Sequence, residues 1–560
     1  MTQHHDSFEN EINPHSLFEH PIGRREFLRL SAGGVAVASG LSALSSVTAL
    51  SKAEAAAAKK GGTIVLGWEA DPDVLAPVAA TAGNTIRAMY YLYEPLISED
   101  VTVKAPTIPP LVPGLAKSWT ISSDGIVYTF NLRENVKFHD GTPFNAEAVK
   151  FNFDSGMDEK HPYYSAGKRA VLGALLRWID RVEMVDAMTI RIILKEPIGD
   201  MERLLAGLTI GMISPSAIKK YGVEKIGLNP VGTGPYRFVE REIGQKIVLE
   251  KNKDYWGPQP LIDRIIIRPI VEAAARDAAL EAGEIDFNVV VSPDSIARFQ
   301  RNPNITVQLG GPPHIWMWMM NNRDTPTKDK RVRQALNWGI NREALVRDIL
   351  KGSAEPAKGP IPPGHPAYTP ELYPGYGYDP AKAKALLSEA GYPNGVRLKA
   401  LIPASGSGMM VPIAINEFLQ ANVKQVGVDV EFEVVEWATF LATSRKGMTP
   451  DHSIHNSSWS TNTFYWIEQM WHTKQQPPGG NNRGWHSDPK IDELLDKGRV
   501  EVSEEKRLGY YREAGKLLWE NAPWVFVVHD LLPRAHASRL KGWVAPASWY
   551  IDLSKAYFEA

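Results

Sequence analysis

Four histidines in the C-terminal part of the chain are the residues whose type could bind a metal ion. His452 and His455 are three positions apart in a segment, residues 451–459, that reads as a polar strand. Side chains three apart on a regular strand point to opposite faces, so such a strand could not direct both imidazoles at one ion. His472 and His486 would have to converge with them in three dimensions. We expect no metal or other cofactor, and convergence of the four histidines is the alternative.

Motifs of the common enzyme classes are missing from this sequence. It contains no GxxxxGK[ST], HExxH or GxSxG pattern, and Gly406-Ser407-Gly408 matches the last only in part. His139-Asp140 lies in a turn ahead of a capped helix, so we assign it no catalytic role. The passage VGTGPY, residues 231–236, lacks the third glycine of a dinucleotide loop and predicts a turn. We therefore expect a protein that is not an enzyme.

Aromatic residues gather in one stretch of about fifty residues, where they alternate with Asn, Ser, Thr and His. Flat rings can stack on a ligand while short polar groups orient it, which makes this composition typical of a recognition cleft. A place in the core is the alternative for most of these rings. We expect at least two of them to face a ligand; the six are Trp437, Trp459, Tyr465, Trp466, Trp471 and Trp485.

A second candidate for ligand contact is the small-residue loop ATAGNT, residues 80–85. It leads into a helix expected over residues 85–93. The first backbone N–H groups of a helix have no partner within the helix and can bind oxygen atoms of a ligand. Gly83 and Asn84 are the residues of this loop that we expect at the site.

The elements that position these residues are clearest between Pro113 and Phe153. Asp124-Gly125 separates two runs of alternating apolar residues, which predicts a tight hairpin with one buried face. Asp140-Gly141 predicts a second turn. Asn145 is placed to cap a helix whose apolar residues recur at helical spacing.

Strand and helix patterns then alternate along the rest of the chain. Strands are expected at residues 61–69, 184–194, 247–252, 265–270, 428–435 and 524–528, and helices at 273–282, 329–339, 341–350, 379–391, 489–497 and 503–520. Residues 314–321, HIWMWMMN, carry bulky apolar groups at both alternating sets of positions. This strand is therefore expected to be buried on both faces of a sheet covered by helices. The fold class is α/β.

Bulk composition narrows the possible functions. A chain of 560 residues exceeds what one core usually supports, so two or three domains are expected. Lys and Arg number 62 against 64 Asp and Glu, without long runs of one charge, and nothing suggests binding to nucleic acid. Cysteine is absent, which excludes disulfides and thiolate chemistry.

The N-terminus has the pattern of an export signal. Arg24-Arg25 precede a weakly apolar stretch, residues 31–50, that is followed by alanine-rich residues. Paired arginines indicate twin-arginine export, with cleavage expected near residues 55–58 and residues 1–58 forming the signal peptide. Retention of the stretch as a membrane anchor is the alternative. No later segment has the length and apolarity to span a bilayer.

Several passages together resemble the family 5 extracellular solute-binding proteins, the peptide- and nickel-binding subunits of ABC importers. Besides the stretch PGLAKSWTISSDGIVYTFNLRENVKFHDGTPFNAEAV, they are PVGTGPYRF, KNKDYWG, KRVRQALNWGINREALV, YDPAKAKALLSEAGYP and SDPKIDELLDKGR, in that order. The resemblance implies a two-lobed periplasmic binding protein of type II, cluster C, with an extra α+β domain inserted in the first lobe. Lobe I would comprise residues 61–97, 230–312 and 529–560, the inserted domain 98–229, and lobe II 314–527.

The resemblance also implies how a peptide would be held, and here the sequence departs from it. Peptide-binding relatives hold the ligand's ammonium with an aspartate three residues after a tryptophan; in this chain the tryptophan is Trp459 and the aspartate is replaced by Asn462. The passage that matches their carboxylate-binding arginine is Ser405-Gly406-Ser407-Gly408, which carries no charge. Losing one partner of a buried charged pair costs on the order of 2–5 kcal/mol. An uncharged or polyol-rich ligand would suit these residues better than a short zwitterionic peptide.

The expected function is that of a periplasmic substrate-binding subunit, soluble after export, that closes by hinge motion around a solute and delivers it to an ABC permease at the cytoplasmic membrane. The ligand is peptide-like or another small organic molecule, and a monomer is expected. Alternatives are a receptor for an oligosaccharide, an opine-like compound or a metal chelate, a receptor for a longer peptide held by its backbone, or a periplasmic hydrolase or chaperone on this scaffold. The expected ligand contacts are Trp459, Asn462, Trp437, Gly83 and Asn84.

Overall fold

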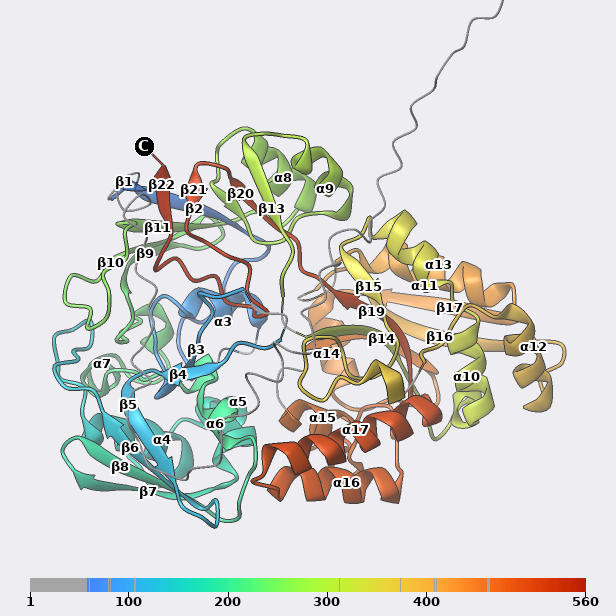
Figure 1. Ribbon diagram of the computed structural model, residues 1–560, viewed down its shortest axis with the longest axis horizontal. Coiled ribbons are helices and arrows are strands. Elements are labelled where there is room, and N and C mark those ends of the chain that lie inside the picture. Colours follow the sequence, from blue (N-terminus) through green and yellow to red (C-terminus); the bar gives the residue numbers. More distant parts are fainter. Residues whose placement is uncertain are drawn as a thin grey trace, which may run out of the picture. The chain divides into compact units, whose positions relative to one another are not determined.

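The structure is a computed structural model that describes residues 58–59, 61–78, 80, 82–104, 107–311, 313–372, 374–406, 408, 410–460 and 464–559 (Figure 1). The expected signal peptide lies outside these residues except for Ala58, and so does the expected ligand contact Asn462. Among the described residues, no helix combines the length and apolarity that crossing a membrane would require.

The first large sheet has seven strands and draws them from three separated parts of the chain. Its order is β13-β20-β12-β2-β11-β10-β9, with β2 parallel to β11 and β12 and the other neighbours antiparallel. Ile64, Leu66 and Trp68 of β2 point into its core. The strands are β2 (Thr63–Trp68), β9 (Tyr236–Glu242), β10 (Lys246–Lys251), β11 (Arg264–Pro269), β12 (Phe287–Asn288), β13 (Ile305–Gln308) and β20 (Arg534–Ala537), and the helices are α3 (Gly83–Met89), α8 (Ala273–Glu281) and α9 (Pro293–Gln300).

Short strands close this unit at the chain ends. β1 (Ala58–Lys59), β21 (Leu540–Lys541) and β22 (Tyr557–Glu559) form a three-stranded sheet in which β22 is central. The C-terminal segment is therefore part of the same unit as the first described residues.

The second sheet has six strands in the order β15-β19-β14-β18-β16-β17. All residues of β14 are buried: Trp316, Trp318 and Met320 face one core, and Ile315, Met317 and Met319 face another. This alternation confirms the strand expected to be buried on both faces, because helices cover both sides of the sheet. The strands are β14 (His314–Met320), β15 (Ala354–Pro356), β16 (Val396–Pro403), β17 (Val428–Val435), β18 (Ile454–Ser460) and β19 (Trp524–Asp530).

Helices on the two faces of the six-stranded sheet come from different parts of the sequence. One core includes residues of α10 (Lys330–Trp338), α12 (Pro380–Glu389) and α13 (Pro412–Lys424), and the other includes residues of α15 (Phe464–Trp471), α16 (Pro489–Val500) and α17 (Glu504–Asn521). α14 is Trp437–Ser444. The helix expected over residues 341–350 begins as α11 (Arg342–Ala344), capped by Asn341, but continues as a wider π-helical turn, Leu345–Ile349.

A third sheet of four strands, order β5-β6-β8-β7, has its own core. The expected hairpin is present: β5 (Ala116–Ile121) pairs with β6 (Val127–Leu132), and Gly125 has a φ of 72°. The single strand expected at residues 184–194 is wrong, because β7 (Ile179–Asp186) and β8 (Thr189–Leu194) form a hairpin there. The Asp186 side chain accepts a hydrogen bond from Met188 N at 2.8 Å, which makes the turn without a glycine.

The remaining elements complete this four-stranded unit and its surroundings. They are the paired strands β3 (Ile97–Glu99) and β4 (Leu111–Pro113), and the helices α4 (Ala146–Met157), α5 (Ala166–Leu176), α6 (Met201–Leu205) and α7 (Pro215–Tyr221).

The cap of α4 offers a test of the sequence reasoning. Asn145 Oδ1 accepts a hydrogen bond from Ala148 N at 3.0 Å, as expected. Asn145→Ala removes this bond and should lower the free energy of unfolding by about 1 kcal/mol, which denaturant unfolding would measure. Asn145→Ser, which retains a capping oxygen, is the control and should stay close to the parent. If both variants lose the same free energy of unfolding, the capping hydrogen bond is not the cause of the loss.

The chain crosses between the seven-stranded and six-stranded sheets after β13 and again after β19. The crossings lie close together, since Gly310 N donates to the Leu531 carbonyl oxygen at 2.8 Å. Leu532 has a φ of 43°, in the left-handed region, and its N–H donates to Asp530 Oδ1 at 2.7 Å. A polar turn thus holds the second crossing segment in a conformation that a leucine rarely adopts.

Candidate functional site

The end of β18 places Trp459 at the carboxyl end of a strand in the six-stranded sheet. The indole is half-buried, its ring centre lies 5.6 Å from that of Trp466, and the Arg483 guanidinium is 5.3 Å from its centre. Trp459 packs against the core that contains Met317 and Met319. One face of the indole is thus supported by the protein, as a stacking platform requires.

The uncharged loop after β16 approaches the same region from the other face of the sheet. A Cβ atom on Gly406 would meet the ring of Trp437 at 2.5 Å, and one on Gly408 would lie 2.8 Å from Ser458 Oγ. Trp437 opens α14, stacks on Phe440 and packs against the core opposite to that of Trp459. A ligand that touches both tryptophans must therefore lie over the end of the sheet and not on one face.

His314 joins the six-stranded sheet to the C-terminal segment. It opens β14, its side chain is buried, and its ring lies 5.5 Å from the ring of Trp549 in an edge-to-face arrangement. Its Nδ1 has no hydrogen-bond partner. The sequence analysis missed both residues, although a histidine at the start of the most apolar strand was a signal.

The charge state of His314 follows from its burial. Burial, helped by nearby His529, lowers the pKa of His314 to about 3, so the ring is neutral at physiological pH. Asp530 Oδ2 lies 3.9 Å from His314 Nδ1, and burial raises the pKa of Asp530 to about 6. We therefore regard this pair as a polar contact and not as an ion pair, since the imidazole would pay a large desolvation cost for its charge.

The segment that carries Trp549 is held by a buried arginine. Arg534 donates to the carbonyl oxygens of Ser548 and Trp549, each at 3.0 Å. Tyr550 stacks on Tyr90 with ring centres 4.9 Å apart. Trp549 is thereby fixed relative to the seven-stranded unit, and its contact with His314 links the two large units.

The start of α3 contains the other two expected contacts. Asn84 is buried; its carbonyl oxygen accepts a hydrogen bond from Trp68 Nε1 at 3.1 Å, and its side chain donates to the Ala70 carbonyl oxygen at 3.4 Å. The helix was expected to begin at residue 85, but it begins at Gly83, and no side chain caps it. For the four expected contacts that the structure describes, no hydrogen bond or ring contact joins Trp437 or Trp459 to Gly83 or Asn84.

The other aromatic residues of the cluster serve mainly the core. Trp471 is fully buried, and Trp485 donates from Nε1 to the Met448 carbonyl oxygen while Arg323 covers its ring. Trp466 supports Trp459. The side chain of Tyr465 lies outside the described part of the chain.

The histidines correct one step of the sequence reasoning. His452 precedes β18, which starts at Ile454, so the expectation that it and His455 point to opposite faces is wrong; their ring centres are 5.6 Å apart. His472 instead lies beside Asp492 and Asp496. Among the described residues, no group of three or more His, Cys, Asp or Glu side chains could hold a metal ion.

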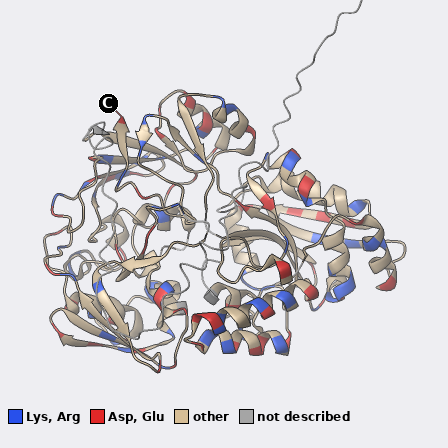
Figure 2. Cartoon of the chain, in the orientation of Figure 1, with Lys and Arg blue, Asp and Glu red and all other residues tan. Residues whose placement is uncertain are grey.

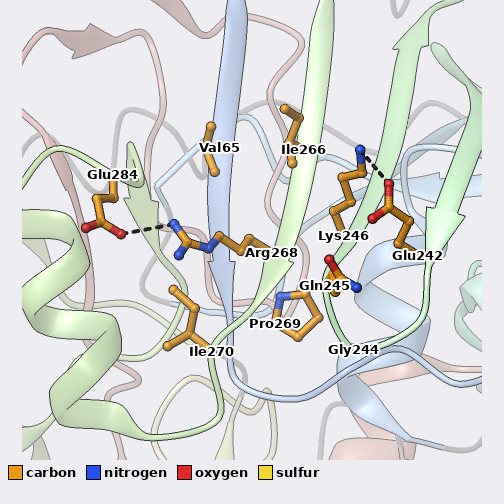
Figure 3. Close-up of a pocket in the computed structure, with 10 residues that line it drawn as sticks. All are labelled: Val65, Glu242, Gly244, Gln245, Lys246, Ile266, Arg268, Pro269, Ile270 and Glu284. Atoms are coloured by element: carbon orange, nitrogen blue, oxygen red, sulfur yellow. Dashed lines mark hydrogen bonds and ion pairs between the residues drawn. The ribbon is translucent and has the colours of Figure 1, made fainter.

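An open groove of about 750 Å³ lies away from this region, on the strands β2 and β11 of the seven-stranded sheet (Figure 3). Its cations are already paired: Arg268 with Glu284 at 3.1 Å and Lys246 with Glu242 at 2.7 Å. The groove therefore presents neutralised charges and partly exposed apolar residues, and we assign it no ligand.

Comparisons with known proteins give consistent matches. Residues 110–478 match the family model described as bacterial extracellular solute-binding proteins, family 5 Middle. The chain is 32% identical over 517 residues to the glutathione-binding protein GsiB of Shigella dysenteriae serotype 1, covering 91% of this chain and 96% of that protein.

Two solved structures show the same architecture. The periplasmic binding protein DppA from Helicobacter pylori, in complex with the peptide STSA, is 27% identical with a TM-score of 0.78, covering 90% of this chain and 99% of that one. MoaA from A. tumefaciens R10, in complex with mannopinic acid, is 26% identical with a TM-score of 0.75, covering 90% of this chain and 100% of that one.

Proposed function

Because this chain belongs to the family 5 bacterial extracellular solute-binding proteins, and so is the substrate-binding subunit of an importer and not an enzyme, we propose that it captures a peptide-like small organic solute at the end of β18. The fold is the two-lobed α/β fold of type II periplasmic binding proteins. Lobe I corresponds to residues 61–97, 230–312 and 529–560, lobe II to 314–527, and the inserted domain to 98–229.

The observation that carries this proposal is the contact between His314 and Trp549 beside the two chain crossings. It brings the end of the six-stranded sheet against the C-terminal segment of the seven-stranded unit. A solute bound there touches both units, and only such a ligand can favour the closed arrangement over the open one. Trp459 and Trp437 of lobe II lie on either side of the contact between His314 and Trp549. Gly83, Asn84 and Asn462 remain predicted ligand contacts.

A peptide-like ligand is favoured by two of the matched proteins. One is named for glutathione and the other holds a tetrapeptide. Ser458 and Ser460 occupy alternate positions of β18 and so lie on the same face of the strand. Ser460 Oγ has no hydrogen-bond partner. A peptide's amide groups can use such neutral donors and acceptors, which accommodates the missing aspartate and arginine anchors.

An opine-like solute is the second candidate. The loop at Gly406 and Gly408 presents backbone and no charged side chain to Trp437 and Ser458. A matched structure holds mannopinic acid. Polar, hydroxyl-rich ligands that stack on indole rings suit such a surface.

The cellular setting of the proposal rests on the N-terminal pattern and on the matched proteins. Twin-arginine export and cleavage near residues 55–58 would place the mature protein in the periplasm, where it would act as a monomer and deliver its ligand to an ABC permease at the cytoplasmic membrane. One matched structure is that of a periplasmic binding protein associated with an ABC transporter.

Ligand identity can be tested directly on the purified protein. Native mass spectrometry should show a co-purified small molecule, and calorimetry with glutathione, Met-Leu dipeptide and mannopinic acid should show binding of the peptide-like probes. Small-angle scattering should show a smaller radius of gyration with the bound probe, because the lobes close on it. Bound ligand with an unchanged radius would rule out hinge closure, and binding of mannopinic acid alone would favour the second candidate.

A further inference from the structure

A second contact between the parts of this protein lies away from the candidate ligand site. It joins residues next to the four-stranded sheet (Arg177, Trp178, Glu196 and Gly199) to residues in and after α15 and α16 (Glu468, Arg499 and Glu501). We call this set the latch. In Figure 1, α16 and α17 lie beside the four-stranded unit, as these contacts require.

Arg499 is the centre of the latch. Its Nη1 pairs with Glu196 Oε1 at 2.5 Å, and its carbonyl oxygen accepts a hydrogen bond from Gly199 N at 2.8 Å. The guanidinium also lies 4.8 Å from the ring centre of Trp178. Charge, backbone and ring contacts from one unit thus meet on one residue of the other.

The latch is tightly packed. The cavity between Trp178, Glu468 and Arg499 measures about 10 Å³, which leaves room for about one water molecule at most. Gly199 has no room for a side chain: an added Cβ would overlap the carbonyl oxygen of Glu501 and lie 2.8 Å from Arg507 Cδ. The nearest atoms to that position all belong to the opposite unit.

Each side of the latch keeps partners of its own when the contact opens. Arg499 retains Glu468 at 3.5 Å and Asp496 at 3.2 Å, and Glu468 retains a hydrogen bond from Gln475 at 3.0 Å. Arg177 retains its stacking on Trp178. Arg499 and Glu468 therefore keep charged or polar partners on their own side when the contact opens, which limits the cost of separating the buried groups. Basic and acidic residues are interspersed along α16 and α17, so this side of the latch does not carry charge of a single sign (Figure 2).

We propose that the latch stabilises the closed arrangement of the two lobes in the absence of ligand, and that Arg499, Glu196 and Gly199 set the affinity of solute capture from outside the ligand site. This inference rests on the proposed function, since it assumes that the lobes open and close. The apparent dissociation constant of a ligand that needs the closed state rises in proportion as the closed fraction falls. Weakening the latch therefore lowers affinity for every ligand equally.

The test uses distance measurements on the full mature chain without ligand. The protein has no cysteine, so Met184→Cys and Val434→Cys provide unique attachment sites for spin labels, and both native side chains are about half exposed. Glu196→Gln removes the ion pair with Arg499 and should raise the open-to-closed ratio about threefold to tenfold. Gly199→Ala introduces a steric clash only in the closed arrangement and should raise the ratio by about tenfold or more.

Matched controls separate the latch from general effects of substitution. Glu134→Gln breaks an exposed pair with Lys117 in the four-stranded unit, and Gly173→Ala adds a methyl group where no atom lies within 4 Å. Both should leave the distance distribution of the parent unchanged. Parent-like distances in both Glu196→Gln and Gly199→Ala would overturn the proposal.

Adding glutathione distinguishes this inference from the proposed function. Two results together would support the function and refute the latch. The parent would close when glutathione is added, and both latch variants would show the same distances as the parent when no ligand is present. Open ligand-free variants together with a parent that binds none of the probes would support the latch and count against the proposed ligands. Where glutathione binds, its affinity should fall in the latch variants by the same factor as the closed fraction.

Discussion

Replacing Trp459 by alanine is expected to weaken glutathione binding by about 10- to 100-fold, because a buried tryptophan at the centre of a binding surface commonly contributes 2 kcal/mol or more. The indole lies at the end of β18, supported by Trp466 and by the Arg483 guanidinium. Truncation removes the flat surface on which a ligand would stack. Isothermal titration calorimetry with glutathione measures the change.

Trp485→Ala is the matched control for this prediction. Trp485 belongs to the same unit and also lies under an arginine, Arg323, but its Nε1 binds the Met448 carbonyl oxygen. Its loss should affect stability more than binding. Trp459→Phe should recover part of the affinity, and Asn462→Ala should weaken binding without unfolding the protein. Unchanged affinity in Trp459→Ala, with parent-like circular dichroism, would remove Trp459 from the site.

The contribution of Glu94 to stability is expected to fall as the pH rises from about 4.5 to about 7, opposite in sign to that of the buried histidines such as His314 and His455, whose pKa values burial lowers. Burial raises the pKa of Glu94 to about 7, against the smaller opposing effect of hydrogen bonds from Trp256, Tyr255 and Thr233. The folded protein therefore holds a proton that the unfolded chain releases. The favourable contribution is complete below the unfolded pKa and is lost as the pH passes the folded pKa, with a magnitude of about 3 kcal/mol.

Glu94→Gln should remove this contribution, so the free energy of unfolding of the variant minus that of the parent should increase as the pH rises from 5 to 8. Glutamine can accept the bonds from Thr233 and Trp256 and donate to the Tyr255 hydroxyl, so the site stays satisfied without a charge. Unfolding midpoints between pH 5 and pH 8 measure the slope, and the variant should exceed the parent at pH 8. Burial also raises the pKa of Asp530 to about 6, so its contribution to stability changes with pH in the same direction as that of Glu94. If the stability of the variant changes with pH as much as that of the parent, Glu94 does not titrate in this pH range.

The local elements were predictable because neighbouring residues specify them. Asp124-Gly125 makes the hairpin turn, Asn145 caps α4, and Asp379 with Pro380 begins α12. Burial of β14 on both faces followed from its unbroken apolar run. The hairpin β7-β8 was missed because Asp186 makes the turn through its side chain, which leaves no glycine or proline as a signal.

The candidate site was predictable only in part. Trp459 and Trp437 stood out by composition, yet the sequence did not show that they pack against opposite faces of one sheet. His314 and Trp549 meet because two crossing segments bring β14 beside the C-terminal segment. The histidine pair was misread because β18 begins after His452.

The sequence by itself determined the family, the α/β class, most helices and strands, and the absence of enzyme motifs, since these depend on local patterns and ordered motifs. Tertiary structure alone decided which side chains meet across the units. Arg499 and Glu196 are 303 positions apart, and nothing near either residue identifies the other as its partner. The physical reason is that periodicity and turn chemistry act over a few residues, whereas the latch and the contact between His314 and Trp549 depend on how separate sheets pack.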